Sequence, residues 1–378
     1  MSVRAFDVVV IGAGIAGAAV AYHAAARGLA TAIIEAGRAG RATTAGAGII
    51  SNHGLRDDEF GREWLSLVRS STAEYASLMA QLGEGAEQRS DYRVVGEVVL
   101  ASTEDEQVEL DRFQSASASP PIGTDKPDMH RLSGRDLRTD WPSIRDDLQG
   151  LFISTTARVD GNRLADLLVE RAQAHGAVLL HGEARIEPGR HPTVRVGDDA
   201  FSAREVVVAA GIWTPRLVEP LGVRVVVVPD RGQIVHLSGG REAPAAPVLK
   251  SFGGPYVLGF SGPRIVVGAT HETSEAPSAD VRAGDQLEVL EQAFSVAPGL
   301  RAHTILETRV GFRPASVDGL PLVGRVDDRV SVLTGLGSWG LTLGPLLGRR
   351  LVDGMTGSDD PGGLDVSVFS PNRASVAV

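Results

Sequence analysis

The chain has 378 residues, of which 43% are hydrophobic and 22% are charged, a composition typical of a globular protein with room for two hydrophobic cores. The formal net charge of −10 argues against nucleic acid as a partner, because a nucleic-acid-binding face needs clustered positive charge. The absence of cysteine excludes disulfides, thiolate nucleophiles and iron–sulfur clusters, so redox chemistry would require a bound organic cofactor or a metal.

Residue spacing argues against a metal site and a membrane span. The nine histidines form no HxH, HxxH or HxxxH pair, so we expect no bound metal. No run reaches the roughly 18 apolar residues of a transmembrane helix, and the N-terminal residues do not resemble a secretory signal. We therefore expect a cytoplasmic protein with a small-molecule partner and no membrane partner. The oligomeric state is left open, and a homo-oligomer is possible.

The first elements along the chain predict one βαβ unit. Phe6–Ile11 is a short valine-rich run, typical of a strand buried on both faces of a parallel sheet. Ala18–Arg27 is alanine-rich and predicts a helix that ends at Gly28. Ala30–Ile34 predicts the second strand, and Glu35 follows it.

The turn between this strand and helix reads GAGIAG and fits the pattern G-x-G-x-x-G. In that pattern the first glycine permits a tight turn, the second lets the backbone approach a pyrophosphate, and the third lets helix and strand pack closely. Phosphates bind the free N–H groups at the helix N-terminus, and the acid after the second strand binds ribose hydroxyls. We therefore expect a dinucleotide, and not NADP, at Gly12, Gly14, Ile15, Ala16, Gly17, Glu35 and Ala36.

The middle of the chain predicts a second layer. Phe60–Leu82 has helical periodicity, and residues 89–151 mix short β segments with a polar loop near Ser115–Pro127. Asn162–His175 predicts a helix of the first domain. The remaining predicted strands are Val178–Leu180, Glu205–Ala209, Arg224–Val228, Gln233–Leu237, Tyr256–Leu258, Arg264–Gly268 and Val330–Thr334, and the remaining helices are Gln286–Phe294 and Gly340–Asp353.

Three later segments are suited to a large planar cofactor. They are the small-residue loop of residues 43–48, the buried strand that leads into residues 209–213, and the glycine-rich strand-to-helix junction of residues 334–342. A helix N-terminus at the junction places partial positive charge where a flavin ring becomes negative on reduction. The expected cofactor contacts are Thr43, Thr44, Ala47, Gly48, Ala210, Gly211, Trp213, Gly337, Ser338, Trp339, Gly340, Leu341 and Thr342.

The most specific motif is the run VGFRPASVDGLPLVG over Val310–Gly324. With Arg231–Gln233, Val266–Glu272 and the segment order, it resembles the D-amino-acid oxidase superfamily, especially the glycine oxidase and sarcosine oxidase branch. The resemblance implies an α/β plus α+β fold: a discontinuous Rossmann-like FAD-binding domain (residues 1–85, 150–220 and 305–378) and an antiparallel-sheet substrate domain (residues 86–149 and 221–304). It also adds Arg185 and Arg313 to the expected cofactor contacts.

The resemblance also implies a reaction. Arg313 would hold the substrate carboxylate and Tyr256 would lie near the substrate, while hydride passes from the α-carbon to flavin N5. The resulting imine would be hydrolysed and O2 reduced to H2O2. Because covalent flavin needs a Cys or a particular His, we expect noncovalent FAD.

Two departures from the glycine oxidase pattern bear on the substrate. Ser338, followed by Trp339, stands where glycine oxidase has a basic side chain in its C-terminal flavin loop, and Gly259 and Phe260 replace Pro-Arg after Tyr256. The expected substrate is therefore the amine of glycine, an N-substituted glycine or another amino acid, and the added apolar surface favours an N-substituted glycine or other secondary amino acid with an extended apolar arm over free glycine. Three alternatives stay open: an FAD-dependent dehydrogenase of a D-amino acid or 2-hydroxy acid with a non-oxygen acceptor, a non-catalytic flavin-holding subunit, and a nicotinamide dehydrogenase.

Overall fold

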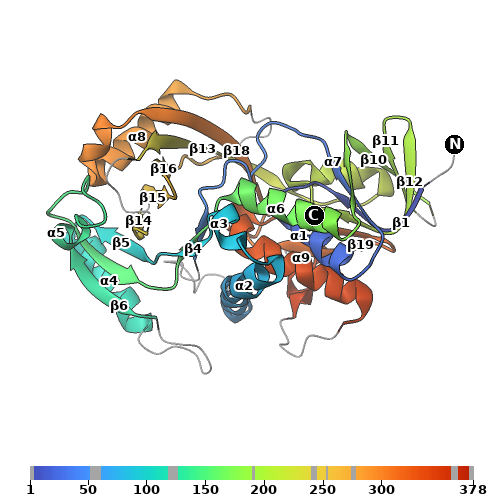
Figure 1. Cartoon of the computed structure of the whole chain (residues 1–378), viewed down its shortest axis with the longest axis horizontal. Coiled ribbons are helices and arrows are strands. Elements are labelled where there is room, and N and C mark those ends of the chain that lie inside the picture. Colours follow the sequence, from blue (N-terminus) through green and yellow to red (C-terminus); the bar gives the residue numbers. More distant parts are fainter. Residues whose placement is uncertain are drawn as a thin grey trace.

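The computed structural model describes residues 4–51, 61–117, 127–189, 192–239, 245–252, 254–273, 278–358 and 365–373. Residues 118–126 of the expected polar loop, and the histidines at positions 53 and 191, lie outside the described residues. Two main sheets lie side by side, with the parallel one at the right of Figure 1 and the antiparallel one at the left.

The first sheet is built around parallel strands in the order β20-β12-β1-β2-β9. Its strands are β1 (Arg4–Ile11), β2 (Thr31–Glu35), β9 (Val178–His181), β10 (Ala184–Glu187), β11 (Thr193–Val196), β12 (Asp199–Val208), β19 (Leu322–Asp327) and β20 (Val330–Thr334). Because segments far apart in sequence pair here, their C-terminal ends meet at one edge, the usual place for a ligand in an open α/β sheet.

Helices cover one face of the parallel sheet. They are α1 (Ile15–Ala26), α2 (Gly61–Leu82), α3 (Ala86–Ser90), α6 (Gly161–Ala174) and α9 (Gly340–Thr356). Val8 and Val10 of β1 face these helices, whereas Val9 and Ile11 face a second cluster that includes α7 (Thr214–Val218). Both sides of β1 are thus buried, which confirms the reading of its valine-rich run.

The second sheet is antiparallel except for one parallel pair, β14 with β5. Its order is β17-β13-β16-β15-β14-β5-β7-β6, with β18 also paired to β13. The strands are β5 (Glu97–Ala101), β6 (Met129–Ser133), β7 (Gln149–Ile153), β13 (Val228–Ser238), β14 (Val248–Ser251), β15 (Tyr256–Phe260), β16 (Arg264–Gly268), β17 (Glu272–Thr273) and β18 (Ile305–Ala315).

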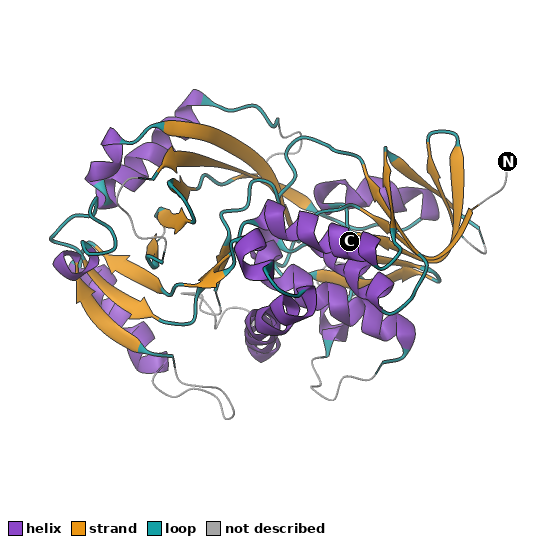
Figure 2. Ribbon diagram, in the orientation of Figure 1, coloured by secondary structure: helices purple, strands orange, loops and turns teal. Residues whose placement is uncertain are grey.

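Helix α8 (Ala283–Val296) covers the outer face of the antiparallel sheet, where Val235, Val257 and Val267 are buried. The inner face carries Ile234 and Leu258 and contacts the segment after β2. Figure 2 shows most helices gathered around the parallel sheet, and the antiparallel strands in the other half. The remaining elements are β3 (Ile49–Ile50), β4 (Arg93–Val94), β8 (Ala157–Arg158), α4 (Glu104–Ser117), α5 (Gly134–Leu137), η1 (Gly211–Trp213), η2 (Glu219–Leu221), η3 (Pro298–Ala302), η4 (Gly337–Trp339) and η5 (Val366–Phe369).

The predicted elements are largely confirmed, with one error. The expected strand Arg224–Val228 is wrong, because residues 223–227 have no strand assignment and β13 begins at Val228. Val225 is buried in the cluster beside the parallel sheet, so the valine run is satisfied by packing instead of by ladder hydrogen bonds. The fold class is confirmed. The domain boundaries stay a prediction. Two strands of the antiparallel sheet, β18 and all of β7 except Gln149, fall in segments that the prediction assigns to the first domain.

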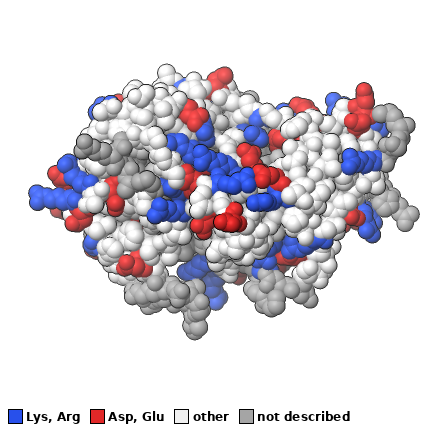
Figure 3. Space-filling view, viewed as in Figure 1, with Lys and Arg blue, Asp and Glu red and all other residues white. Residues whose placement is uncertain are grey.

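Surface charges alternate in sign. In Figure 3 basic and acidic side chains lie intermingled across the middle of the molecule. Ion pairs such as Arg89–Glu170 and Arg325–Glu205 join them. Within the described part of the chain, no helix is long and apolar enough to cross a membrane.

Candidate active site

A cavity of about 940 Å³ runs between the two sheets. At one end it is lined by the glycine turn after β1, and at the other by side chains of the antiparallel sheet, including Tyr256 and Arg313. The volume lies near the upper limit of small-molecule pockets, which span roughly 300–1,000 Å³. The cavity can therefore hold an elongated ligand together with a second, smaller one.

The glycine turn is possible only without side chains. Gly12 has a φ of +105°, and a Cβ there would lie 2.5 Å from the carbonyl oxygen of Ala209. A Cβ on Gly17 would lie 1.9 Å from the carbonyl oxygen of Gly12. The first and third glycines thus perform the roles that the motif predicts, the tight turn and the close packing of helix on strand.

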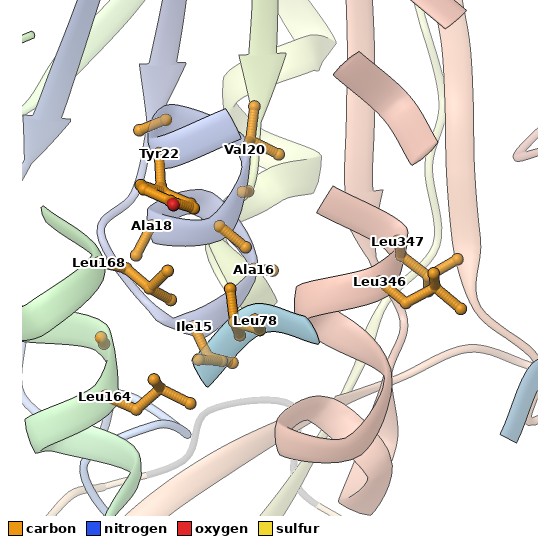
Figure 4. Packing of buried hydrophobic residues seen from close by; sticks show 14 of the residues in the cluster. Ile15, Ala16, Ala18, Val20, Tyr22, Leu78, Leu164, Leu168, Leu346 and Leu347 are labelled. Atoms are coloured by element: carbon orange, nitrogen blue, oxygen red, sulfur yellow. The ribbon is translucent and has the colours of Figure 1, made fainter. Parts of the chain in front are cut away.

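Helix α1 begins at the cavity. Gly14 is the N-cap residue and provides no side-chain cap, and Gly14, Ile15 and Ala16 all line the cavity. The Thr43 hydroxyl accepts a hydrogen bond from Ile15 N at 3.0 Å. Figure 4 shows how the helix is held, with Leu164 and Leu168 of α6 directed toward it. The helix N-terminus at the cavity, with its dipole, suits a phosphate.

Glu35 lies where β2 ends and organises the same turn. Its two carboxylate oxygens accept hydrogen bonds from Ala13 N and Gly37 N, each at 2.7 Å. Arg41 approaches it at 3.7 Å. Since an ionised carboxylate has about four acceptor positions, two remain for hydroxyl groups of a ligand.

At the other end, two polar side chains lie across glycines of the antiparallel sheet. The Tyr256 hydroxyl is 2.5 Å from the position a Cβ of Gly268 would occupy, and the Arg313 guanidinium is 2.4 Å from that of Gly232. Tyr256 pairs with Gly268 across β15 and β16, and Gly232 lies on β13 next to β18. Tyr256 and Arg313 therefore converge over the middle strands from opposite sides.

Among the described residues, only the Nη1 atom of the Arg313 guanidinium has hydrogen-bond partners. Its Nη1 donates to Asp230 Oδ2 at 3.1 Å and to the carbonyl oxygen of Thr270 at 3.2 Å, and it lies 3.2 Å from His271 Nδ1. Burial alone would raise the pKa of Asp230, yet the hydrogen bond with His271 and the charge of Arg313 bring the pKa below its ordinary value. Among the described residues Nε and Nη2 of Arg313 have no partner, so they can bind a carboxylate.

Tyr256 supplies a neutral donor beside this arginine. Burial raises the pKa of Tyr256 to about 12, although the charge of Arg313 acts to lower it. The phenol therefore stays protonated at any physiological pH. Within the described chain its hydroxyl has no hydrogen-bond partner, and because Tyr256 lines the cavity a bound ligand can provide one.

Most predicted site residues line the cavity. These are Gly12, Gly14, Ile15, Ala16, Glu35, Ala36, Thr43, Ala47, Gly48, Arg185, Ala210, Gly211, Trp213, Tyr256, Arg313, Gly337, Ser338, Trp339, Gly340, Leu341 and Thr342. Gly17 and Thr44 are not among the lining residues: Gly17 packs against Gly12, and the Thr44 hydroxyl donates to the carbonyl oxygen of Arg41.

The expected apolar wall is present only in part. Trp339 lines the cavity and meets Trp64 edge-on, with ring centroids 5.2 Å apart. Phe260 and Gly259 do not line it, so the expectation that they add apolar surface there is wrong. The Phe260 ring is buried beneath Gly48, and the guanidinium of Arg264 stacks on it, with Cζ of Arg264 4.0 Å from the ring centroid.

Sequence reasoning missed several cavity residues. Arg38, Arg41 and Arg216 lie among those at the Glu35 end, while Lys250 and His271 lie with Tyr256 and Arg313. A signal existed for Lys250, since lysine is rare in this chain, but nothing in the local pattern placed it. Among the described residues no group of three or more His, Asp or Glu side chains could hold a metal ion.

The donor set fits a dinucleotide-linked flavin. A helix start suited to a phosphate and an acid suited to ribose hydroxyls lie at one end of the cavity, and the N-terminal end of α9 and the guanidinium of Arg313 lie at the other. A family model described as FAD dependent oxidoreductase matches residues 7–354.

Relatives and solved structures agree with this match. The oxidoreductase YurR of Bacillus subtilis (strain 168) is 34% identical over 97% of this chain and 98% of its own. The crystal structure of iminodiacetate oxidase (IdaA) from Chelativorans sp. BNC1 superposes with a TM-score of 0.87 at 34% identity, covering 96% of this chain and 98% of its own. Glycine oxidase from Geobacillus kaustophilus superposes with a TM-score of 0.84 at 26% identity, covering 98% and 99%.

Proposed function

Because the chain belongs to the DAO family of FAD-dependent oxidoreductases, as its resemblance implied, we propose that it oxidises the secondary amine of an N-substituted glycine. It is an FAD-dependent oxidoreductase for amino-acid-like substrates. The proposal concerns the particular amine and the acceptor, which we take to be O2. One observation carries it: Arg313 and Tyr256 line the same cavity over glycines of two neighbouring strands, each with hydrogen-bonding groups unused by the described chain.

The names of similar proteins support this choice. Glycine oxidase and iminodiacetate oxidase are named for substrates that carry a glycine unit, and iminodiacetate is itself an N-substituted glycine. A site for such a substrate must hold one carboxylate and leave room beyond the nitrogen. The presence of Arg313, Tyr256 and Lys250 in the lining of one cavity supports such a site at its antiparallel-sheet end.

We propose that three parts of the cavity lining bind three parts of FAD. Gly12, Gly14 and the start of α1 would bind the pyrophosphate, Glu35 the adenosine ribose, and the junction of η4 with α9 the flavin ring. Bound FAD supplies an acceptor for the hydride that leaves the glycine carbon. Trp339 and Leu341 contribute apolar surface that excludes water from this part of the cavity.

The protein's own contribution is positioning. Arg313 binds the carboxylate through Nε and Nη2, and Tyr256 donates to one of its oxygens. The glycine carbon loses a hydride and the nitrogen a proton, which leaves an imine; water then adds, and the C–N bond breaks to give a primary amine and glyoxylate. The two electrons reduce O2 to H2O2.

A substrate screen tests the proposal. The FAD-loaded enzyme is mixed with glycine, sarcosine, N-alkylglycines, D-amino acids and 2-hydroxy acids, and H2O2 is measured alongside anaerobic bleaching of the flavin. We expect the highest kcat/KM for an N-substituted glycine. Bleaching without H2O2 would contradict O2 as the acceptor, and bleaching only by a 2-hydroxy acid would contradict amine oxidation.

A further inference from the structure

Lys250 lies in the same cavity as Tyr256 and Arg313, and the proposed reaction gives it no role. It is on β14, directly paired with Tyr256 of β15, so both side chains point to the inner face of the sheet. Its side chain is 25% exposed. A cation in a partly closed cavity that binds amino-acid-like substrates needs an explanation.

The ammonium group is oriented by a buried acid. Lys250 Nζ donates to Glu97 Oε2 at 2.6 Å, and the Ser51 hydroxyl donates to the same oxygen at 3.1 Å. Glu97 is almost fully buried and does not line the cavity, whereas Lys250 and Ser51 do. The ammonium of Lys250 thus lies at the cavity, and the carboxylate of Glu97 lies behind it in the protein interior. An ammonium has three N–H donors, and the described residues use one.

Strand order places this cation across the substrate from Arg313. The strands run β14, β15, β16, β13, β18. Lys250 is on β14 and Arg313 on β18, so they lie on opposite sides of Gly268 and Gly232, the glycines of the strands between them. Strands are about 4.8 Å apart, so β14 lies roughly 10 Å from β16. A substrate whose carboxylate is held over β16 and β13 would extend its nitrogen substituent toward β14.

We propose that Lys250 determines specificity by binding a second anionic group at the end of the nitrogen substituent. The substrate class is then the N-(carboxyalkyl)glycines, amines that carry one carboxylate for Arg313 and one for Lys250. This inference rests on the proposed function, because it assumes that Arg313 binds the glycine carboxylate. It replaces the apolar arm expected from sequence by a charged one.

Matched substrates test the assignment. Each N-(carboxyalkyl)glycine, with one to four methylenes between nitrogen and the distal carboxylate, is compared with the same molecule whose distal carboxylate is an amide. We expect wild type to prefer at least one dicarboxylate over its amide by on the order of 10- to 100-fold in kcat/KM, as when a charge-assisted hydrogen bond is lost. In Lys250→Met the preference should disappear, and Lys250→Arg should keep part of it.

Binding provides a readout independent of turnover. Ether analogues, in which oxygen replaces the amine, cannot form the imine: diglycolate and its longer homologues replace the dicarboxylates, and methoxyacetate replaces sarcosine. Their Kd values follow from changes in the flavin spectrum. We expect K250M to weaken the dicarboxylate ethers by a similar factor and to leave methoxyacetate unchanged.

Two results would overturn the assignment. One is a wild type that prefers no dicarboxylate over its amide. The other is an equal loss of kcat/KM in K250M for all substrates, which would place Lys250 in a step that every substrate undergoes. If K250M fails to fold because Glu97 loses its partner, Lys250→Met with Glu97→Gln removes both charges and is tested in the same way. Turnover of N-alkylglycines by wild type separates the two proposals: if it occurs without dicarboxylate preference, only the role of Lys250 fails, and if no N-substituted glycine bleaches the flavin, both fail.

Discussion

Gly232 and Gly268 show how single residues shape the substrate end of the cavity. Each lies in a strand interior, where glycine weakens a sheet, yet each is covered by a functional side chain from a neighbouring strand. Any Cβ at Gly232 would displace the Arg313 guanidinium, and any Cβ at Gly268 would displace the Tyr256 hydroxyl. The bare backbone is therefore what allows two polar groups from different strands to meet.

At Arg313 the first prediction is a loss of substrate binding. Arg313→Leu removes the partner of the substrate carboxylate, and such losses cost about 2–5 kcal/mol, at least roughly 30-fold in KM. FAD should remain bound, because the glycine turn and Glu35 are untouched. Steady-state kinetics and flavin content measure both effects. Arg204→Leu is the control, since Arg204 is 79% exposed; unchanged kinetics in R313L would mean that the carboxylate is bound elsewhere.

A second prediction concerns the link between protein and flavin. The chain has no cysteine, and His271 is the histidine among the described cavity-lining residues. His271 is paired with Asp230 at 2.9 Å and matches no covalent-linkage motif. Acid precipitation should therefore release all FAD into the supernatant. Yellow colour that stays with the pellet would contradict noncovalent binding, and its loss in His271→Ala would identify the attachment point.

The sequence could predict the residues that belong to continuous motifs. Arg313 lies in a fifteen-residue run and Gly12 in a six-residue turn, so local order was enough to assign them. Lys250 could not be placed in this way, because its partner Glu97 is 153 positions away and meets it only through the parallel pairing of β5 with β14. The expectation for Phe260 failed because its ring, on the same face of the sheet as Leu258, is covered by the segment at Gly48, which the local sequence could not indicate.

At the scale of elements, the contact of α1 with β1 depends on its glycines. The carbonyl oxygen of Gly12 occupies the space that a side chain on Gly17 would need. Gly348 of α9 is equally close to α1, since a Cβ there would lie 2.8 Å from Ala19 Cβ. Helices α1 and α9, which both begin at the cavity, are thus held in place through residues without side chains.

This packing yields a third prediction. Gly17→Ala places a Cβ 1.9 Å from the Gly12 carbonyl oxygen, so α1 must shift, and the helix start that we propose binds the pyrophosphate must move with it. We expect weaker FAD binding and a lower Tm. The control is Gly284→Ala in α8, an exposed helical glycine with nothing near its Cβ position. That change should be neutral or stabilising by about 0.5–1 kcal/mol. Equal behaviour of the two variants would contradict the packing argument.

Elements with a clear period were predictable, and those that depend on partners were not. Strands β16 and β20 have the bounds expected from their alternating or continuous apolar residues. Residues 224–228 contain more valine than either of these strands, yet the chain joins a ladder only at Val228, because β propensity does not specify a partner strand.

Across the whole molecule, all four tyrosines are held in environments that oppose ionisation. Burial is the leading cause in each case: it raises the pKa of Tyr22, raises that of Tyr92 and Tyr256 to about 12, and raises that of Tyr75 far above its ordinary value. They belong to different parts of the fold, from α1 through the α2 region to the antiparallel sheet. Tyrosine ionisation therefore reports on the integrity of the entire structure.

The fourth prediction follows from proton linkage. Below pH 10, the ordinary pKa of a phenol, all four tyrosines are protonated in both the folded and the unfolded chain, so the stabilisation they provide is fully present. As pH rises from 10 toward 12 the unfolded chain releases protons that the folded chain retains, and the free energy of unfolding falls. Phenolate absorbance should therefore appear late and together with loss of the circular dichroism signal, whereas the denatured chain should show four tyrosinates with a midpoint near pH 10. A tyrosinate that forms reversibly near pH 10 while the circular dichroism signal stays native would show that at least one phenol is open to water. If Tyr256→Phe removed this early phenolate absorbance, Tyr256 could not be the permanently neutral donor that we propose for carboxylate binding.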